Sequence, residues 1–221
     1  MNSSRSWLWG LLMAAVLVCG CDEDGQEVPA EKEQAQMKQE VVPMEQEKTQ
    51  LERNIVEVER KSVKLETTMG DIVIEMNEKA APGTVKNFLE YVESGFYDGV
   101  IFHRVMSDFM IQAGGFTAEM VKKQPRAPIK NEFKESNLRG TIAMAKLPGN
   151  PDSATCQFFI NLGNNSRNLD NQNGGFTVFG KVTEGMDVVD AIALVNTTTK
   201  MGMEDVPVEP VVIKSAKLVS E

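Results

Sequence analysis

The most informative part of this sequence is a pair of neighbouring stretches, Ile101-Phe102-His103-Arg104-Val105 and Phe109-Met110-Ile111-Gln112-Ala113-Gly114-Gly115-Phe116. Aromatic and β-branched residues are frequent in both and favour two strands joined by a tight bend. Arg104 and Gln112 are the exceptions, because burying such polar groups without a partner is costly. We therefore expect both side chains to line a groove, with a structural ion pair of Arg104 as the alternative.

Strand periodicity predicts which side chains share a face, because residues two apart point the same way. The rule places Arg104 on the face of Phe102 and turns His103 to the opposite face. It also brings together two further pairs: Met110 with Gln112, and Gln157 with Phe159. His103 is the only histidine of the chain, and no matched carboxylate motif accompanies it. We therefore interpret His103 as a structural residue.

The pattern around these stretches is that of a compact, mostly β domain. Alternating apolar residues at 63–65 and 72–76 flank a turn at 69–71 and predict a hairpin. Apolar spacings of three and four residues predict an amphipathic helix over 85–92, and a second short helix is expected over 186–192. Further strands are expected at 100–105, 109–113, 140–145, 157–161, 176–182 and 211–219. Many short strands with only two helices suggest a closed barrel or a sandwich with helical caps.

With three further blocks, the two stretches resemble the signature of cyclophilin-type peptidyl-prolyl isomerases. The further blocks follow in order, which makes chance resemblance negligible: Gly140-Thr141-Ile142-Ala143-Met144-Ala145, Ser153-Ala154-Thr155-Cys156-Gln157-Phe158-Phe159-Ile160-Asn161, and Val178-Phe179-Gly180-Lys181-Val182 with Gly185-Met186-Asp187. The string Pro128-Ile129-Lys130-Asn131-Glu132 is similar to the bacterial branch of the family. The resemblance implies a mainly β fold, a closed eight-stranded antiparallel barrel capped by two α-helices.

The resemblance also implies roles for individual residues. Arg104 is expected to be catalytic, and a mostly apolar set is expected to line the proline-binding groove: Phe109, Met110, Gln112, Ala145, Gln157, Phe159, Leu169 and Phe176. Phe176 occupies a position that holds His in many eukaryotic members. Asn168 departs from the family, because members have Trp or another aromatic residue there. Affinity for the cyclosporin class of inhibitor therefore does not follow from the resemblance, whereas the residues expected for catalysis are all present.

Composition restricts the other functions open to the chain. Its 221 residues include 23 Lys and Arg against 32 Asp and Glu, a net charge of −9. Such an acidic chain lacks the basic footprint of a nucleic-acid binder. One histidine and no clustered cysteines exclude a His-rich or Cys-rich metal site, although an all-carboxylate site stays open. Isomerisation breaks no covalent bond, so we expect no cofactor, no metal, and proline-containing polypeptide segments as partners.

The first twenty residues are typical of a secretory signal. A lone cation, Arg5, precedes an apolar run over 7–18. That run is shorter than the roughly 20 residues needed to cross a bilayer, so a permanent spanning helix is the weaker alternative. The following Val18-Cys19-Gly20-Cys21 resembles the bacterial lipobox, which implies that residues 1–20 are removed and Cys21 is acylated. An ordinary cleaved signal is the other alternative.

An acidic Glu/Gln/Lys-rich tether follows over residues 21–60. From residue 22 to residue 60 there are 12 acidic and 5 basic side chains, a net charge of −7, and almost no aromatic residues. We expect a solvated linker, with a short helix in its second half as the alternative. The chain thus divides into a lipoprotein signal peptide (1–20), this tether and an isomerase domain (61–221). The acylated Cys21 would make the lipid bilayer a partner and hold the domain on the extracytoplasmic side of a bacterial envelope.

Three smaller features complete the expectations. Cys156 lies in a predicted buried strand, so we expect a buried free thiol. The three basic residues Lys122, Lys123 and Arg126 are interpreted as a solvated loop. The segment 164–175, rich in Asn and Gly, is interpreted as a surface loop beside the groove.

The leading functional prediction is a peptidyl-prolyl cis-trans isomerase that accelerates X-Pro isomerisation in secreted or envelope proteins. A membrane-tethered binding module or chaperone that holds proline segments with little turnover is the alternative, and Asn168 motivates it. A scaffold that acts through the tether is a third hypothesis. The sequence leaves open the client proteins, the oligomeric state and the membrane that carries the anchor.

Overall fold

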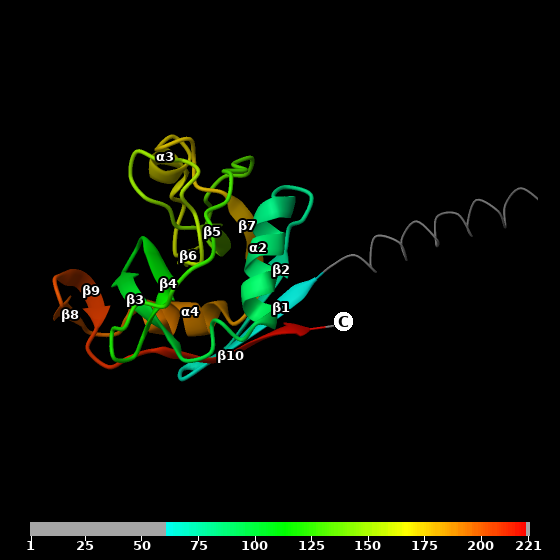
Figure 1. The fold of residues 1–221 in the computed structure, drawn as a ribbon. Helices are drawn as coiled ribbons and strands as arrows, with labels where there is room; N and C mark the ends of the chain where they lie inside the picture. The colour runs from blue at the N-terminus through cyan, green and yellow to red at the C-terminus, as the bar shows by residue number, and fades with distance from the viewer. Residues whose placement is uncertain (1–60, 220–221) are drawn as a thin grey trace, which may run out of the picture. The chain divides into compact units, whose positions relative to one another are not determined.

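The computed structural model describes residues 61–219, so the expected signal peptide and tether lie outside the described residues. Eight of its strands close into an antiparallel barrel in the order β1-β10-β3-β4-β6-β5-β7-β2 (Figure 1). The bounds of these strands are β1 Ser62–Thr67, β2 Gly70–Met76, β3 Val100–Met106, β4 Met110–Thr117, β5 Thr141–Met144, β6 Phe158–Asn161, β7 Val178–Glu184 and β10 Val212–Val219. The predicted mainly β barrel is confirmed, and the sandwich alternative is wrong.

The first hairpin shows how sequence alternation builds the barrel. Val63 and Leu65 of β1 and Ile72 and Ile74 of β2 are all fully buried, whereas the residues between them are partly exposed. Leu65 pairs with Ile72 and Val63 with Ile74, so the apolar side chains of both strands enter the same interior. The hairpin predicted from the alternating pattern is therefore confirmed.

Three helices accompany the barrel: α2 (Pro82–Glu93), the one-turn α3 (Ser166–Leu169) and α4 (Met186–Ala193). The predicted pair of helices corresponds to α2, which contacts β7 and β10, and to α4, which contacts β2, β3 and β4. Helix α3 lies within the segment expected to be a loop. Across residues 61–219, no helix combines the length and the apolar character needed to cross a membrane.

An aromatic cluster joins α2 to the barrel interior. Phe88 of α2 packs at ring-centroid distances of 5.0 Å from Phe179, 5.2 Å from Tyr97 and 5.5 Å from Phe158. All four side chains are fully buried, and the hydroxyl of Tyr97 donates a 2.9 Å hydrogen bond to the backbone carbonyl of Cys156. Cys156 itself is a buried free thiol, as expected.

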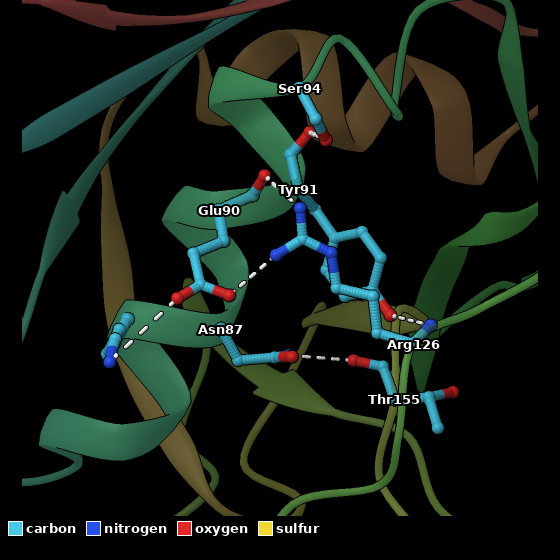
Figure 2. A network of polar contacts seen from close by, with 7 residues as sticks. Asn87, Glu90, Tyr91, Ser94, Arg126 and Thr155 are labelled. Atoms are coloured by element: carbon cyan, nitrogen blue, oxygen red, sulfur yellow. Dashed lines mark hydrogen bonds and ion pairs between the residues drawn. The ribbon is translucent and has the colours of Figure 1, made fainter.

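The long connection between β4 and β5 is tied to α2 (Figure 2). The backbone N–H of Arg126 donates to the Tyr91 hydroxyl at 2.7 Å, and its guanidinium pairs with Glu90 at 2.5 Å. Lys123 donates to the carbonyl of Phe96 and lies over its ring, whereas Lys122 is exposed. The three basic residues do lie in a loop, with Lys122 and Arg126 exposed as expected, and the side chains of Arg126 and Lys123 in addition anchor the connection.

A two-stranded hairpin outside the barrel was not expected from the sequence. It consists of β8 (Thr197–Lys200) and β9 (Met203–Pro207), and β9 lies against β3. Figure 1 shows the hairpin in orange-red beside β3 and β4. Val206 of β9 is buried with Ile101 and Met120 in a small cluster separate from the barrel interior. This cluster fixes the hairpin to the outer face of β3.

The aromatic cluster generates a stability prediction. Truncation of Phe88 to Ala should lower the free energy of unfolding by ~3–5 kcal/mol, because it removes a fully buried ring and leaves a cavity among packed aromatic side chains. Urea unfolding followed by circular dichroism measures the change. Leu194→Ala is the matched control, since Leu194 is 81 % exposed and its loss should change stability by less than about 0.5 kcal/mol. Equal effects of the two substitutions would contradict this account of the core.

Candidate active site

A β-bulge in β3 sets the position of Arg104. Phe102 pairs with Ala113 and Arg104 pairs with Gln112, so His103 is an extra residue without a partner on β4. Because a bulge interrupts the two-residue alternation, Phe102 enters the barrel core while Arg104 remains 44 % exposed on the outside. The prediction that Arg104 and Phe102 share a face is therefore wrong, whereas Arg104 and Gln112 do lie side by side.

The same bulge puts His103 on the side of Arg104. Both residues line a recess of about 470 Å³, so the prediction that His103 points away from Arg104 is wrong. The imidazole is only 5 % exposed and packs 4.9 Å from the ring of Phe116. Its Nδ1 atom has no hydrogen-bond partner among the described residues. Burial lowers the pKa of His103 from 6.5 to about 4, so the imidazole is neutral at neutral pH.

A pair of glutamine side chains borders the site, one from β4 and one from the residue directly before β6. Gln112 Nε2 donates a 2.8 Å hydrogen bond to Gln157 Oε1. Gly115 makes room for this pair, because a Cβ at that position would lie 2.5 Å from Gln157 Nε2. The two glutamines also line a second hollow of about 400 Å³, on whose rim Ala145 lies. The pair therefore separates two hollows, of which only the first contains Arg104.

The apolar residues expected in the groove form one cluster. Six of them come together from four parts of the chain: Phe109, Met110, Ala145, Phe159, Leu169 and Phe176. The rings of Phe159 and Phe176 meet edge to face at 5.7 Å, and Lys146 Nζ lies 4.9 Å from the centre of the Phe176 ring. Phe159 pairs with Gln112 across β4 and β6, so the cluster borders the glutamine pair. The structure thus brings together every groove residue that the resemblance implied.

A buried amide network supports this cluster, and no motif or periodicity in the sequence predicted it. Asn165 Nδ2 donates to the carbonyl of Phe109 at 2.7 Å and to Asn161 Oδ1 at 2.8 Å. Asn137, which is fully buried, donates from Nδ2 to the carbonyl of Phe176 at 3.1 Å and to Asp170 at 2.9 Å. Asn161 Nδ2 donates in turn to Asn137 Oδ1 at 3.2 Å. The hydrogen bonds of this network hold the backbone of Phe109 and Phe176, two aromatic residues of the cluster.

The segment 164–175 is therefore more than the surface loop that was expected. It contains α3, and its Asp170 carboxylate accepts hydrogen bonds from both the backbone and the side chain of Asn137. Burial opposes ionisation of Asp170, but these hydrogen bonds prevail and lower its pKa. Leu169 points into the apolar cluster, while Asn168 beside it is exposed. Asn168, the residue that departs from the family pattern, thus lies at the edge of the cluster, and the packed residues of the cluster are unaffected by it.

Charged groups are distributed unequally around the two hollows. The recess beside Arg104 also includes Glu204 of β9, and Asp205 Oδ2 lies 3.6 Å from Arg104 Nε. The second hollow is lined by Lys122, Lys123 and Lys146. Arg104 therefore lines a recess, as predicted, and it also takes part in an ion pair, which was the alternative interpretation. Across residues 61–219, no set of three His, Cys, Asp or Glu side chains is arranged to hold a metal ion.

The structure combines a closed eight-stranded barrel with an arginine beside a glutamine pair and an apolar cluster. This is the class of protein that the resemblance to cyclophilin-type isomerases implied. The profile of the family described as cyclophilin type peptidyl-prolyl cis-trans isomerase/CLD matches residues 62–218. The chain is 55 % identical over 159 residues to a peptidyl-prolyl cis-trans isomerase, cyp18, of Streptomyces antibioticus, covering 69 % of this chain and 95 % of that protein. It is 49 % identical over 155 residues to peptidyl-prolyl cis-trans isomerase B of Escherichia coli, covering 67 % and 94 % respectively.

A solved structure shows the same fold. A cyclophilin type isomerase of Cryptosporidium parvum superposes with a TM-score of 0.62 at 24 % sequence identity, covering 73 % of this chain and 99 % of that one. The chain belongs to the cyclophilin-type peptidyl-prolyl cis-trans isomerase family, and it is an enzyme of that type.

The burial of His103 generates a pH prediction. The unfolded chain binds a proton at this histidine below about pH 6.5, whereas the native protein does so only below about pH 4, so stability falls as pH decreases through that window. Between pH 7.5 and pH 5 the loss from this one group should be roughly 2 kcal/mol. Urea unfolding at the two pH values should show that His103→Gln loses less stability than the wild type. A titration of the His103 ring by NMR with a midpoint near 6.5 would contradict the prediction.

Proposed function

We propose that Arg104 is the catalytic residue of this isomerase and that the apolar cluster beside the glutamine pair receives the proline ring of the substrate. The single observation that carries the proposal is the exposed guanidinium of Arg104 at a recess whose neighbouring strand supplies Gln112 and Met110. This arrangement places a guanidinium donor beside the strand that also carries Met110 of the apolar cluster. No other described arginine lines either hollow beside the glutamine pair.

The chemistry explains why one arginine suffices. Rotation about an X-Pro bond has a barrier of ~18–20 kcal/mol and takes about 10–100 s without a catalyst, and it breaks no covalent bond. In the twisted transition state the prolyl nitrogen loses conjugation and becomes a hydrogen-bond acceptor. A guanidinium beside that nitrogen stabilises the transition state more than the ground state, which lowers the barrier. A charge-assisted hydrogen bond contributes ~1.5–3 kcal/mol, which is a large part of the decrease in the rotation barrier that catalysis requires.

The remaining site residues bind and orient the substrate. Met110, Phe159 and Leu169 are largely buried and supply the apolar wall for the ring, while Phe109 and Phe176 are partly exposed at its edge. Gln112 offers an amide to a substrate carbonyl. A structure of the Cryptosporidium parvum relative was solved in the presence of the dipeptide Ala-Pro, which supports proline-containing peptides as the substrate class here. His103, neutral because its pKa is about 4, adds no charge beside the rotating bond.

Loss of the guanidinium tests the catalytic role. Arg104→Ala should lower kcat/KM for an X-Pro test peptide by about 10- to 150-fold, the equivalent of one charge-assisted hydrogen bond. Arg139→Ala is the matched control, because Arg139 is also half exposed and also pairs with a carboxylate, Asp190. The assay uses the full chain in detergent with a protease-free fluorescence readout.

The outcomes separate the candidate functions. Unchanged activity in Arg104→Ala would remove Arg104 from the mechanism. A wild-type protein that binds proline peptides but accelerates their isomerisation only weakly would instead favour the binding module, and exposed Asn168 at the edge of the cluster is the observation behind that second candidate.

We propose further that the enzyme is a lipoprotein of a bacterial envelope, held through an acylated Cys21 on the extracytoplasmic side, and that it acts on secreted or envelope proteins. The support is the sequence pattern alone: one cation, a short apolar run, and Val18-Cys19-Gly20-Cys21 followed by an acidic tether. Several acyl chains, each gaining ~0.8 kcal/mol per buried methylene, hold a protein firmly on a bilayer. The tether would then separate the catalytic domain from the membrane surface.

The anchor has a direct test in bacterial cells. Cys21→Ser should abolish incorporation of labelled palmitate and move the protein out of the detergent-soluble membrane fraction. Cys19→Ser is the matched control and should retain both label and membrane association, because Cys19 precedes the cleavage position. Labelling of the Cys21→Ser protein at the wild-type level would exclude acylation at Cys21.

A further inference from the structure

We propose that Asp205, on the hairpin outside the barrel, is a positioning residue that orients the guanidinium of Arg104. The inference rests on the proposed catalytic role of Arg104 and adds a residue to it. Asp205 Oδ2 lies 3.6 Å from Arg104 Nε, and the two side chains are 34 % and 44 % exposed. This is the one ion pair that either residue makes within residues 61–219.

The contact leaves the reactive end of the arginine free. Asp205 approaches Nε, on the inner side of the guanidinium, so the two terminal nitrogens remain available to a substrate. Because the guanidinium is planar, fixing Nε restricts the direction in which both terminal nitrogens point. A carboxylate in this place orients the donor group without occupying the donors that a prolyl nitrogen needs.

The backbone of β9 is shaped to deliver this carboxylate. Thr198 pairs with Val206 and Lys200 with Met203, so one residue on β8 faces two residues on β9, Glu204 and Asp205. The extra residue makes a bulge, a feature that re-aims side chains near active sites. Asp205 also has a φ of +61°, a left-handed conformation that few residues other than Gly adopt and that Asp and Asn tolerate better than most. The bulge and the left-handed residue thus coincide at the hairpin residue that contacts Arg104.

The hairpin holds the carboxylate at a fixed place relative to β3. Val206, directly after Asp205, is 1 % exposed and packs with Ile101 of β3 and with Met120. The N–H of Val208 donates to the carbonyl of Asn196 at 2.9 Å and closes the base of the hairpin. Since Ile101 and Arg104 belong to the same strand, the apolar anchor and the ion pair connect the same two elements.

No other described side chain restrains the guanidinium. Gln112 lies opposite Arg104, but its side-chain hydrogen bond runs from Nε2 to Gln157, and Arg104 donates no hydrogen bond to its Oε1. The neighbouring imidazole of His103 is neutral because its pKa is about 4, and Glu204 lines the recess without an ion pair to Arg104. Orientation of Arg104 therefore falls to Asp205.

The substitution Asp205→Asn removes the charge and retains the shape, and Asn tolerates the left-handed backbone. It should lower kcat/KM about five-fold, the upper range for an exposed ion pair, with the loss in kcat rather than in KM. Glu209→Gln is the matched control: it removes one exposed negative charge from the chain just beyond the hairpin and should leave activity unchanged. Thermal unfolding of each full-length protein in detergent confirms equal folding.

A double-mutant cycle distinguishes positioning from a structural role. If Asp205 acts through Arg104, Asp205→Asn should cost about five-fold in the wild type and nothing in the Arg104→Ala background. The Arg104 Nε–H signal in NMR should also shift in Asp205→Asn while that of Arg139 stays in place.

Three results would overturn the inference: unchanged or increased activity in Asp205→Asn, an equal loss in both backgrounds, or an unshifted Arg104 signal. If Arg104→Ala itself is fully active, the proposed catalytic role has failed. If only Asp205→Asn is fully active, the catalytic role stands and the positioning role has failed.

Discussion

The pairing of β3 with β4, interrupted by one extra residue, is the constraint on which the site depends. With perfect alternation, Phe102 and Arg104 would face the same side, and either a charge would enter the core or an aromatic ring would leave it. The bulge at His103 resolves this conflict, because it lets Phe102 and Val105 fill the barrel while Arg104 stays outside opposite Gln112. The cost is a buried imidazole with an unpaired Nδ1 atom. The strand that carries Arg104 thus owes the placement of this side chain to an irregularity in its pairing with β4.

Sequence reasoning recovered the barrel, because its strands carry clear two-residue periodicity or belong to the quoted motifs. It missed β8 and β9, since a Thr-rich run and a polar strand with a bulge give no alternating apolar pattern. The apolar cluster was predicted through the family resemblance, and its members do pack together. The faces of Phe102 and His103 were predicted wrongly, because a bulge is a property of the pair of strands and leaves no mark in either sequence.

The residues that support the site could not be predicted from the sequence, for a different reason. Asn137 and Asn165 lie outside the strands, where polar residues are normally interpreted as loop, yet they are buried and hold the backbone of Phe176 and Phe109. Asp205 is separated from Arg104 by most of the domain, and only the fold brings them together. Rigid support for a site therefore comes from hydrogen bonds whose partners cannot be paired by spacing along the chain.

Closure of the barrel has a consequence for contacts with other extended chains. Open sheets expose edge strands whose free N–H and C=O groups can pair with any extended segment nearby. In the ring from β1 to β2, every strand is bonded on both sides, so an extended segment finds no edge of the barrel with which to pair. Closure thus removes free strand edges from the barrel, and among the strands of residues 61–219 only those of the β8–β9 hairpin stand outside this ring.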